Sequence, residues 1–127
     1  MISQRSTTVD VSWLEYERAL AALDEALQAP KTSLNRDATI QRFEFCVELA
    51  WKTCKKALGT SSTAPKVVIR EMAQQKLIES PEEWFDYLEA RNLSSHTYKE
   101  ELAEKVYAVA QKFLPRALGL LQKIKKI

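Results

Sequence analysis

Residues 36–58, RDATIQRFEFCVELAWKTCKKAL, contain the pattern that decides the fold. Apolar side chains recur there at steps of three or four residues, which is the spacing of one face of an amphipathic α-helix. The stripe consists of Ile40, Phe43, Val47, Ala50 or Trp51, Cys54 and Leu58. Gly59 follows directly, and glycine readily takes the left-handed conformation in which helices end. The stretch therefore predicts a helix from about Arg36 to Leu58.

The preceding segment, residues 11–28, shows the same periodicity. Its apolar stripe consists of Trp13, Tyr16, Leu20, Leu23 and Leu27. Ala29 and Pro30 end this predicted helix, and a polar connection leads to the next one. The clearest loop of the chain is GTSSTA, residues 59–64. The first half of the sequence is thus typical of two long helices followed by a loop.

The loop is followed by two shorter helical segments. Proline is favoured in a first helical turn, so Pro65 predicts a helix that continues to about residue 76. Residues 67–69, Val-Val-Ile, are also compatible with a strand, but no nearby segment offers a pairing partner. Ser80 and Glu83 have the spacing of a capping box, which predicts a further helix that ends near residues 91–92.

A long last helix is predicted toward residue 127. Thr97 and Glu100 can form a second capping box at its start. Its apolar stripe consists of Leu102, Val106, Val109, Phe113, Ala117, Leu120 and Ile124. Pro115 lacks a backbone N–H and is expected to bend this helix.

Composition agrees with an all-helical chain. Of 127 residues, only two are glycine and four are proline, too few for the many turns of a β-sandwich or barrel. With 46% hydrophobic residues, the chain can bury one core. We therefore predict an all-α, up-and-down bundle of four to five helices, forming a single domain over residues 1–127, with residues 1–8 flexible.

Several features point to a cytoplasmic protein. Residues 1–10 lack the apolar stretch of a signal peptide, and no run approaches the roughly 18 apolar residues of a membrane span. Cys46 and Cys54 lie eight positions apart in one predicted helix, about 12 Å along its axis, which is too far for a disulfide. We expect two reduced thiols on one helix face.

The sequence lacks the common signatures of cofactor and metal sites. There is no glycine-rich phosphate cradle, and two cysteines on one helix with a single histidine supply too few zinc ligands. The 19 basic and 17 acidic residues are also too evenly balanced for a broad nucleic-acid-binding surface. We predict neither a metal nor a cofactor.

The chemically informative stretch is RNLSSHTY, residues 91–98. Helical spacing aims Arg91 along an apolar stripe, where its guanidinium needs a partner or an anion. His96, the one histidine, and Tyr98 flank the predicted start of the last helix, whose free N–H groups favour negative charge. These groups could converge on one phosphate. The alternative is structural, because arginine near a helix C-terminus and histidine near a helix start are common without any function.

The spacing Arg91-x4-His96-x-Tyr98, with Asn92 after the arginine, resembles the signature of HEPN domains, and specifically of the HepT-like branch. Glu48 and Lys52 are similar to a Glu-x3-Lys element that some HEPN proteins carry upstream. Residues 43–52 and 91–98 together resemble the small proteins called nucleotidyltransferase substrate-binding proteins. The resemblance extends over most of the chain.

This resemblance implies a homodimeric helical bundle that pairs with a minimal nucleotidyltransferase in a toxin–antitoxin module. It implies a metal-independent ribonuclease acting on RNA, with Arg91, Asn92 and His96 as catalytic residues. The partner would silence it by transferring AMP from ATP to Tyr98. In an alternative interpretation, the chain is a non-catalytic subunit that binds substrate for the nucleotidyltransferase.

Two points concern the chemistry of the implied site. Cleavage by the RNA 2′-hydroxyl needs a base and an acid at once, and one histidine cannot be both. A two-fold dimer would bring two copies of His96 and Arg91 into one cleft, so the ribonuclease interpretation requires a dimer. Glu48 and Lys52 are accessory candidates, or simply a surface pair at i, i+4 spacing.

Overall fold

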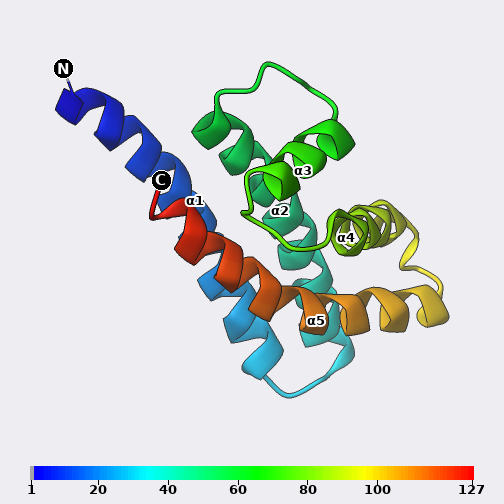
Figure 1. Ribbon diagram of the computed structural model, residues 1–127. Coiled ribbons are helices and arrows are strands. Elements are labelled where there is room, and N and C mark those ends of the chain that lie inside the picture. Colours follow the sequence, from blue (N-terminus) through cyan, green and yellow to red (C-terminus); the bar gives the residue numbers. More distant parts are fainter. Residues whose placement is uncertain (1) are drawn as a thin grey trace.

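The computed structural model describes the backbone of residues 2–127 and the side chains of residues 13–127 (Figure 1). The elements are α1 (Ile2–Gln28), α2 (Ser33–Leu58), α3 (Pro65–Gln74), α4 (Pro81–Leu93), a single 3-10 turn η1 (Ser94–His96), and α5 (Glu100–Ile124). No strand occurs over residues 2–127, so the predicted all-α fold is confirmed and residues 67–69 are helical.

The first helix is longer than predicted at its start. It begins at Ile2 instead of residue 11 and ends at Gln28, as expected. Residue 1 and the side chains of residues 2–12 lie outside the described part of the chain, and the flexibility of residues 1–8 stays a prediction.

Local signals explain the ends of α2 and α4. The Thr32 side chain accepts a hydrogen bond from the backbone N–H of Asn35 and starts α2 slightly before Arg36. Gly59 ends α2 at φ 68°, in the left-handed region where a Cβ is unfavourable. The Ser80 hydroxyl accepts from the Glu83 N–H at 3.2 Å, as the capping box predicts.

The predicted start of the last helix is wrong. α5 begins at Glu100, and its N-cap position is Lys99, which makes no capping bond through its side chain. The Thr97 hydroxyl instead donates to the carbonyl of Ser94 at 3.2 Å. From Glu100, α5 continues through Pro115 to Ile124, and it changes direction along its length in Figure 1.

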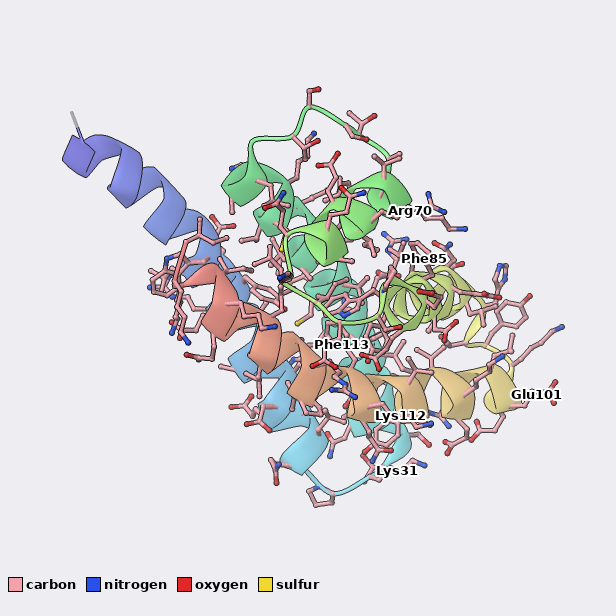
Figure 2. All side chains as sticks on the ribbon, viewed as in Figure 1. Lys31, Arg70, Phe85, Glu101, Lys112 and Phe113 are labelled. Atoms are coloured by element: carbon pink, nitrogen blue, oxygen red, sulfur yellow. The ribbon has the colours of Figure 1, made fainter. Side chains whose placement is uncertain are left out.

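Helix α2 is the central element, since it packs against α1, α3, α4 and α5. Phe113 of α5 lies in the interior (Figure 2), with its ring centroid 5.2 Å from that of Phe43 on α2 and 5.1 Å from that of Tyr87 on α4. Both contacts are edge-to-face, the favoured geometry for aromatic pairs. Tyr16 of α1 is fully buried and donates a hydrogen bond of 2.9 Å to the Ala117 carbonyl.

The two cysteines are free and buried in this core, as predicted. Burial raises the pKa of both Cys46 and Cys54 to about 12, because the apolar interior disfavours a thiolate. Neither thiol is therefore a candidate nucleophile at neutral pH. None of the helices in the described part of the chain is long and apolar enough to cross a membrane.

Candidate functional site

The motif stretch 91–98 lies at the junction of α4 and α5. Arg91 is in the last turn of α4, His96 ends η1, and Tyr98 lies in the turn before α5. Three hydroxyl groups shape this junction, each donating to the carbonyl three residues earlier: Ser94 to Arg91, Ser95 to Asn92, and Thr97 to Ser94. Such local side-chain bonds compete with a regular helix. They explain why the chain tightens into a 3-10 turn there.

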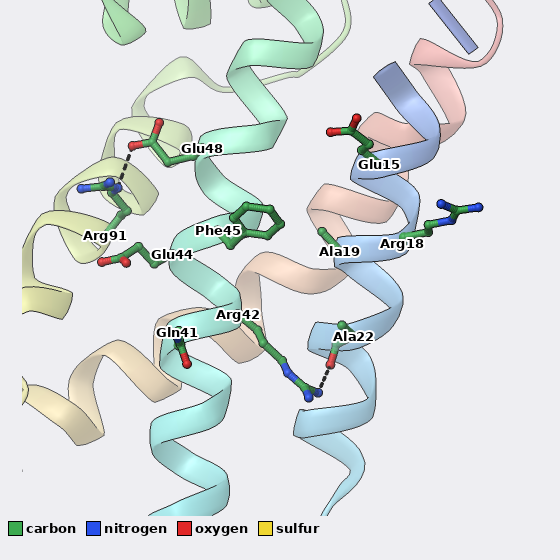
Figure 3. Close-up of a pocket in the computed structure, with 10 residues that line it drawn as sticks. All are labelled: Glu15, Arg18, Ala19, Ala22, Gln41, Arg42, Glu44, Phe45, Glu48 and Arg91. Atoms are coloured by element: carbon green, nitrogen blue, oxygen red, sulfur yellow. Dashed lines mark hydrogen bonds and ion pairs between the residues drawn. The ribbon is translucent and has the colours of Figure 1, made fainter. Parts of the chain in front are cut away.

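Arg91 forms an ion pair with Glu48 of α2. Its Nε lies 2.7 Å from Glu48 Oε1, and the two side chains are 33% and 28% exposed (Figure 3). The carboxylate has a second support, because the indole N–H of Trp51 donates to Glu48 Oε2 at 3.1 Å. Lys52 is a more distant partner, with 3.9 Å between Nζ and Oε2. The partner that helical spacing predicted for Arg91 is therefore a carboxylate.

The contact between Arg91 and Glu48 is an ion pair rather than a directed hydrogen bond. Arg91 Nε is buried and has no hydrogen-bond acceptor of suitable geometry among the described residues. A carboxylate oxygen at 2.7 Å still gives a strong attraction at this half-buried position. Charge, rather than hydrogen-bond direction, thus holds the guanidinium beside α2.

His96 and Tyr98 lie together on the exposed side of the junction. Their ring centroids are 6.1 Å apart, with an interplanar angle of 70°. His96 is exposed, and Tyr98 is 78% exposed. The other three tyrosines of the chain, Tyr16, Tyr87 and Tyr107, are buried. Tyr98 is thus the one phenol of the protein that a macromolecular partner can reach.

Two further residues complete the junction. Glu44, one turn before Glu48 on α2, is a second acceptor for the Ser94 hydroxyl and shares its single proton with the Arg91 carbonyl. Helix α2 therefore holds both ends of the segment from Arg91 to Ser94. The Asn92 side chain is exposed and makes no hydrogen bond within the described part of the chain. An exposed amide is available to a ligand, which is compatible with its predicted role.

An open groove of about 670 Å³ adjoins this junction and extends over α2 to α1. Its charged and aromatic lining residues include Arg18, Arg42, Glu44, Phe45, Glu48 and Arg91. In Figure 3, Phe45 and Arg42 extend from α2 toward α1, whereas Glu44 and Glu48 extend toward Arg91. Phe45 is 60% exposed. Sequence reasoning did not single it out, although an aromatic residue outside the buried stripe of Phe43 and Val47 is a usable signal for an exposed contact.

The start of α5 contributes less than predicted. It lies beyond Tyr98, and its first turn contains Glu100 and Glu101, which oppose an incoming phosphate. Arg36 of α2 makes ion pairs with Glu100 at 2.5 Å and with Glu104 at 3.0 Å. The groups that the structure brings together are thus Arg91 with Glu48, and His96 with Tyr98. No group of three or more potential metal ligands occurs among the described residues.

Similar proteins agree with this architecture. A curated relative, Probable ribonuclease HepT of Haemophilus influenzae, is 35% identical over 95 residues, which are 68% of this chain and 65% of that relative. The chain therefore spans somewhat less than two thirds of the relative's length. A crystal structure of a Thermus thermophilus protein matches with a TM-score of 0.80 and 30% identity, over 86% of this chain and 98% of that one.

A second solved structure, from Haemophilus influenzae, is described as the fold of a substrate binding domain of a nucleotidyltransferase. It matches with a TM-score of 0.68 and 26% identity, over 94% of this chain and 98% of that one. The family model described as "Nucleotidyltransferase substrate binding protein like" matches residues 12–126. Because this match covers nearly the whole chain, the protein belongs to the nucleotidyltransferase substrate-binding protein family, as the motif of residues 91–98 predicted.

Proposed function

We propose that this protein is a homodimeric, metal-independent endoribonuclease of the cytoplasm, the toxin of a module whose antitoxin is a minimal nucleotidyltransferase. The observation that carries the proposal is the junction of α4 and α5, where Arg91, His96 and Tyr98 follow one another on a single segment whose Arg91 lines an open groove. Similarity to a relative named as a probable ribonuclease supports the same activity.

The chemistry needs only groups of the chain and of the RNA. A base removes the proton of the 2′-hydroxyl, whose oxygen attacks the adjacent phosphorus while the bond from phosphorus to the 5′-oxygen breaks. An acid protonates that leaving oxygen, and a cyclic 2′,3′-phosphate forms. Arg91 would stabilise the negative charge that builds up on the phosphorane oxygens. Asn92 would hydrogen-bond the phosphate or His96.

The requirement for a dimer follows from the single histidine. Each protomer brings one His96, so one copy would act as base and the other as acid within a cleft shared across a two-fold axis. The exposed position of His96 supports this arrangement, because a buried ring could not meet its symmetry mate.

Tyr98 would be the site at which the partner silences the enzyme. Its phenol oxygen would attack the α-phosphorus of ATP held by the nucleotidyltransferase, forming a tyrosyl–AMP bond, losing its proton and releasing pyrophosphate. The product places bulk and negative charge beside His96, whose ring centroid lies 6.1 Å from that of Tyr98. RNA phosphate would then be excluded by sterics and by repulsion.

The test of the ribonuclease is cleavage of RNA by the purified protein in EDTA. Wild-type protein should cut RNA to products with cyclic phosphate ends, and Arg91→Ala or His96→Ala should reduce the rate by about a hundredfold or more. Arg116→Ala is the matched control, since Arg116 is an exposed arginine that pairs with Glu83 outside the junction. Intact RNA with wild-type protein, or equal loss in Arg116→Ala, would contradict the proposal.

The family description favours a second function, that of a non-catalytic subunit which binds substrate for the nucleotidyltransferase. The groove supports it, because Phe45 offers a ring for a base and Arg91 a charge for a phosphate. On this hypothesis RNA stays intact, whereas the complex loses nucleotidyl transfer to its substrate when Phe45 is replaced by alanine.

A further inference from the structure

We infer that Glu48 is a positioning residue, which orients the guanidinium of Arg91 for the phosphate in the proposed reaction. The inference rests on the proposed function and assigns a role to a carboxylate that would otherwise be out of place. A carboxylate beside a phosphate-binding arginine repels the phosphate and weakens its binding, so we expect the carboxylate to have a compensating role. The contacts of Glu48 with Arg91 and Trp51 point to the positioning of the guanidinium as that role.

Glu48 contacts the inner nitrogen of the guanidinium. Its Oε1 lies 2.7 Å from Arg91 Nε, and the two terminal nitrogens donate no hydrogen bond within the described part of the chain. A guanidinium can bind a phosphate through two parallel N–H groups. An ion pair at Nε therefore holds the guanidinium beside α2 and leaves the N–H groups of its outer edge without a hydrogen-bond partner in the described part of the chain.

Glu48 is itself held in place. The Trp51 indole donates to its second oxygen at 3.1 Å, and Trp51 is a core residue with 8% of its surface exposed. This buried ring connects the carboxylate to the rigid interior of α2. The contacts of Trp51 with Glu48 and of Glu48 with Arg91 thus fix the guanidinium relative to the core, as the supporting residues of a preorganised site do.

The alternative is that Glu48 only forms a surface ion pair with Lys52 and has no role in the site. The distances argue against it, because Lys52 Nζ is 3.9 Å from the carboxylate, compared with 2.7 Å for Arg91 Nε. Lys52 is also 59% exposed, so solvent screens its charge. The main partner of Glu48 is therefore Arg91, on a different helix.

This role predicts a particular kinetic signature. Glu48→Gln keeps the size of the side chain and an acceptor for Trp51, but removes the charge that holds Arg91. We expect kcat to fall roughly tenfold while KM for RNA changes by less than about twofold, because orientation is lost and repulsion is relieved at the same time. Glu48→Ala, which also removes the acceptor, should lower kcat further.

The matched control is Glu83→Gln, since Glu83 holds the Nε of Arg116 in a similar pair at 3.2 Å away from the junction. It should leave kcat and KM unchanged. If Glu48→Gln retains the wild-type kcat, or if its loss merely follows a drop in melting temperature that Glu83→Gln shares, the positioning role is refuted.

A second readout does not depend on RNA cleavage. In a nitrogen–proton NMR spectrum, the Nε–H signal of Arg91, assigned by its absence in Arg91→Ala, should shift and exchange faster with solvent in Glu48→Gln. An unchanged signal would overturn the inference. If wild-type protein cuts no RNA but this signal shifts, the proposed ribonuclease fails while the control of Arg91 by Glu48 stands.

Discussion

At the scale of single residues, exposure separates the functional candidates from residues of the same type. Tyr98 is 78% exposed, whereas Tyr16 and Tyr87 are buried. Burial raises the pKa of both buried phenols, that of Tyr16 well above its ordinary value, so neither is a nucleophile at neutral pH. Packing therefore leaves Tyr98 as the one exposed phenol of the chain.

The residue-scale prediction concerns Tyr98. Incubation with the cognate nucleotidyltransferase and ATP should add one AMP group to the chain and abolish RNA cleavage, because the adduct lies beside His96. Intact-mass and peptide mass spectrometry should locate the AMP on Tyr98. The Tyr98→Phe variant lacks only the phenol oxygen and should stay unmodified and uninhibited. An AMP group on another residue, or none at all, would exclude this silencing mechanism.

At the scale of elements, the two ends of the motif segment are held by different charges of α2. In the middle of α2, Glu48 contacts Arg91 and Glu44 contacts Ser94. Near the start of α2, the buried Arg36 pairs with Glu100 and Glu104 at the beginning of α5. The exposed turn with His96 and Tyr98 lies between these two attachments, so α2 contacts the chain both before and after the turn.

The element-scale prediction is a pH dependence of stability. Hydrogen bonds from Lys31 and Arg36 lower the pKa of Glu104 below its ordinary value of 4.5. A carboxyl with a lowered pKa in the folded state stabilises the fold above its unfolded pKa, and this contribution disappears as the pH falls from 4.5 through the folded value. Glu104→Gln should therefore lower stability at pH 7 and match wild type in strong acid. The expected loss is small, because Glu104 is 43% exposed.

Urea unfolding followed by circular dichroism at neutral pH and at about pH 3 measures this effect. Glu101→Gln is the control, since Glu101 lies in the same part of α5 with no ion pair among the described residues and extends away from the bundle in Figure 2. It should show no comparable change. A constant difference between Glu104→Gln and wild type at both pH values would contradict the linkage.

At the scale of the whole molecule, the groove reaches the junction through three shared residues. Glu44, Glu48 and Arg91 belong to both, so a substrate in the groove would reach the motif arginine directly. Glu15, Glu44 and Glu48 keep the groove from being broadly basic, in agreement with a net charge of only +2. If the proposed function holds, recognition of RNA would therefore depend on a few placed groups rather than on bulk attraction.

The molecular prediction tests the shared cleft. If both copies of His96 are needed, wild-type and His96→Ala chains refolded together in equal amounts should retain about a quarter of the wild-type activity, since only a quarter of random dimers have two histidines. Independent protomers would retain about half. Wild-type chains refolded together with Arg116→Ala chains should retain the full wild-type activity. A monomer in sedimentation at micromolar concentration would contradict the shared cleft outright.

Local sequence signals predicted most of the fold. The stripe around Phe43 and Val47, the cap at Ser80 and the left-handed Gly59 each act within a few residues, so their effects can be read without knowing the partners. The start of α5 was missed for the opposite reason. Thr97 and Glu100 have capping-box spacing, but Thr97 bonds back to Ser94, and Glu100 pairs with Arg36, which is distant in the sequence.

By itself, therefore, the sequence determined an all-helical chain, its family, and the residues of the motif, because periodicity, caps and motif spacing are local properties. Only the tertiary structure decided which carboxylate holds Arg91, that Tyr98 alone among the tyrosines is exposed, and that Phe45 faces a groove. Those facts depend on how α2 packs against α1 and α4. Spacing along one helix could pair Glu48 with Lys52, but only packing between helices could bring it to Arg91.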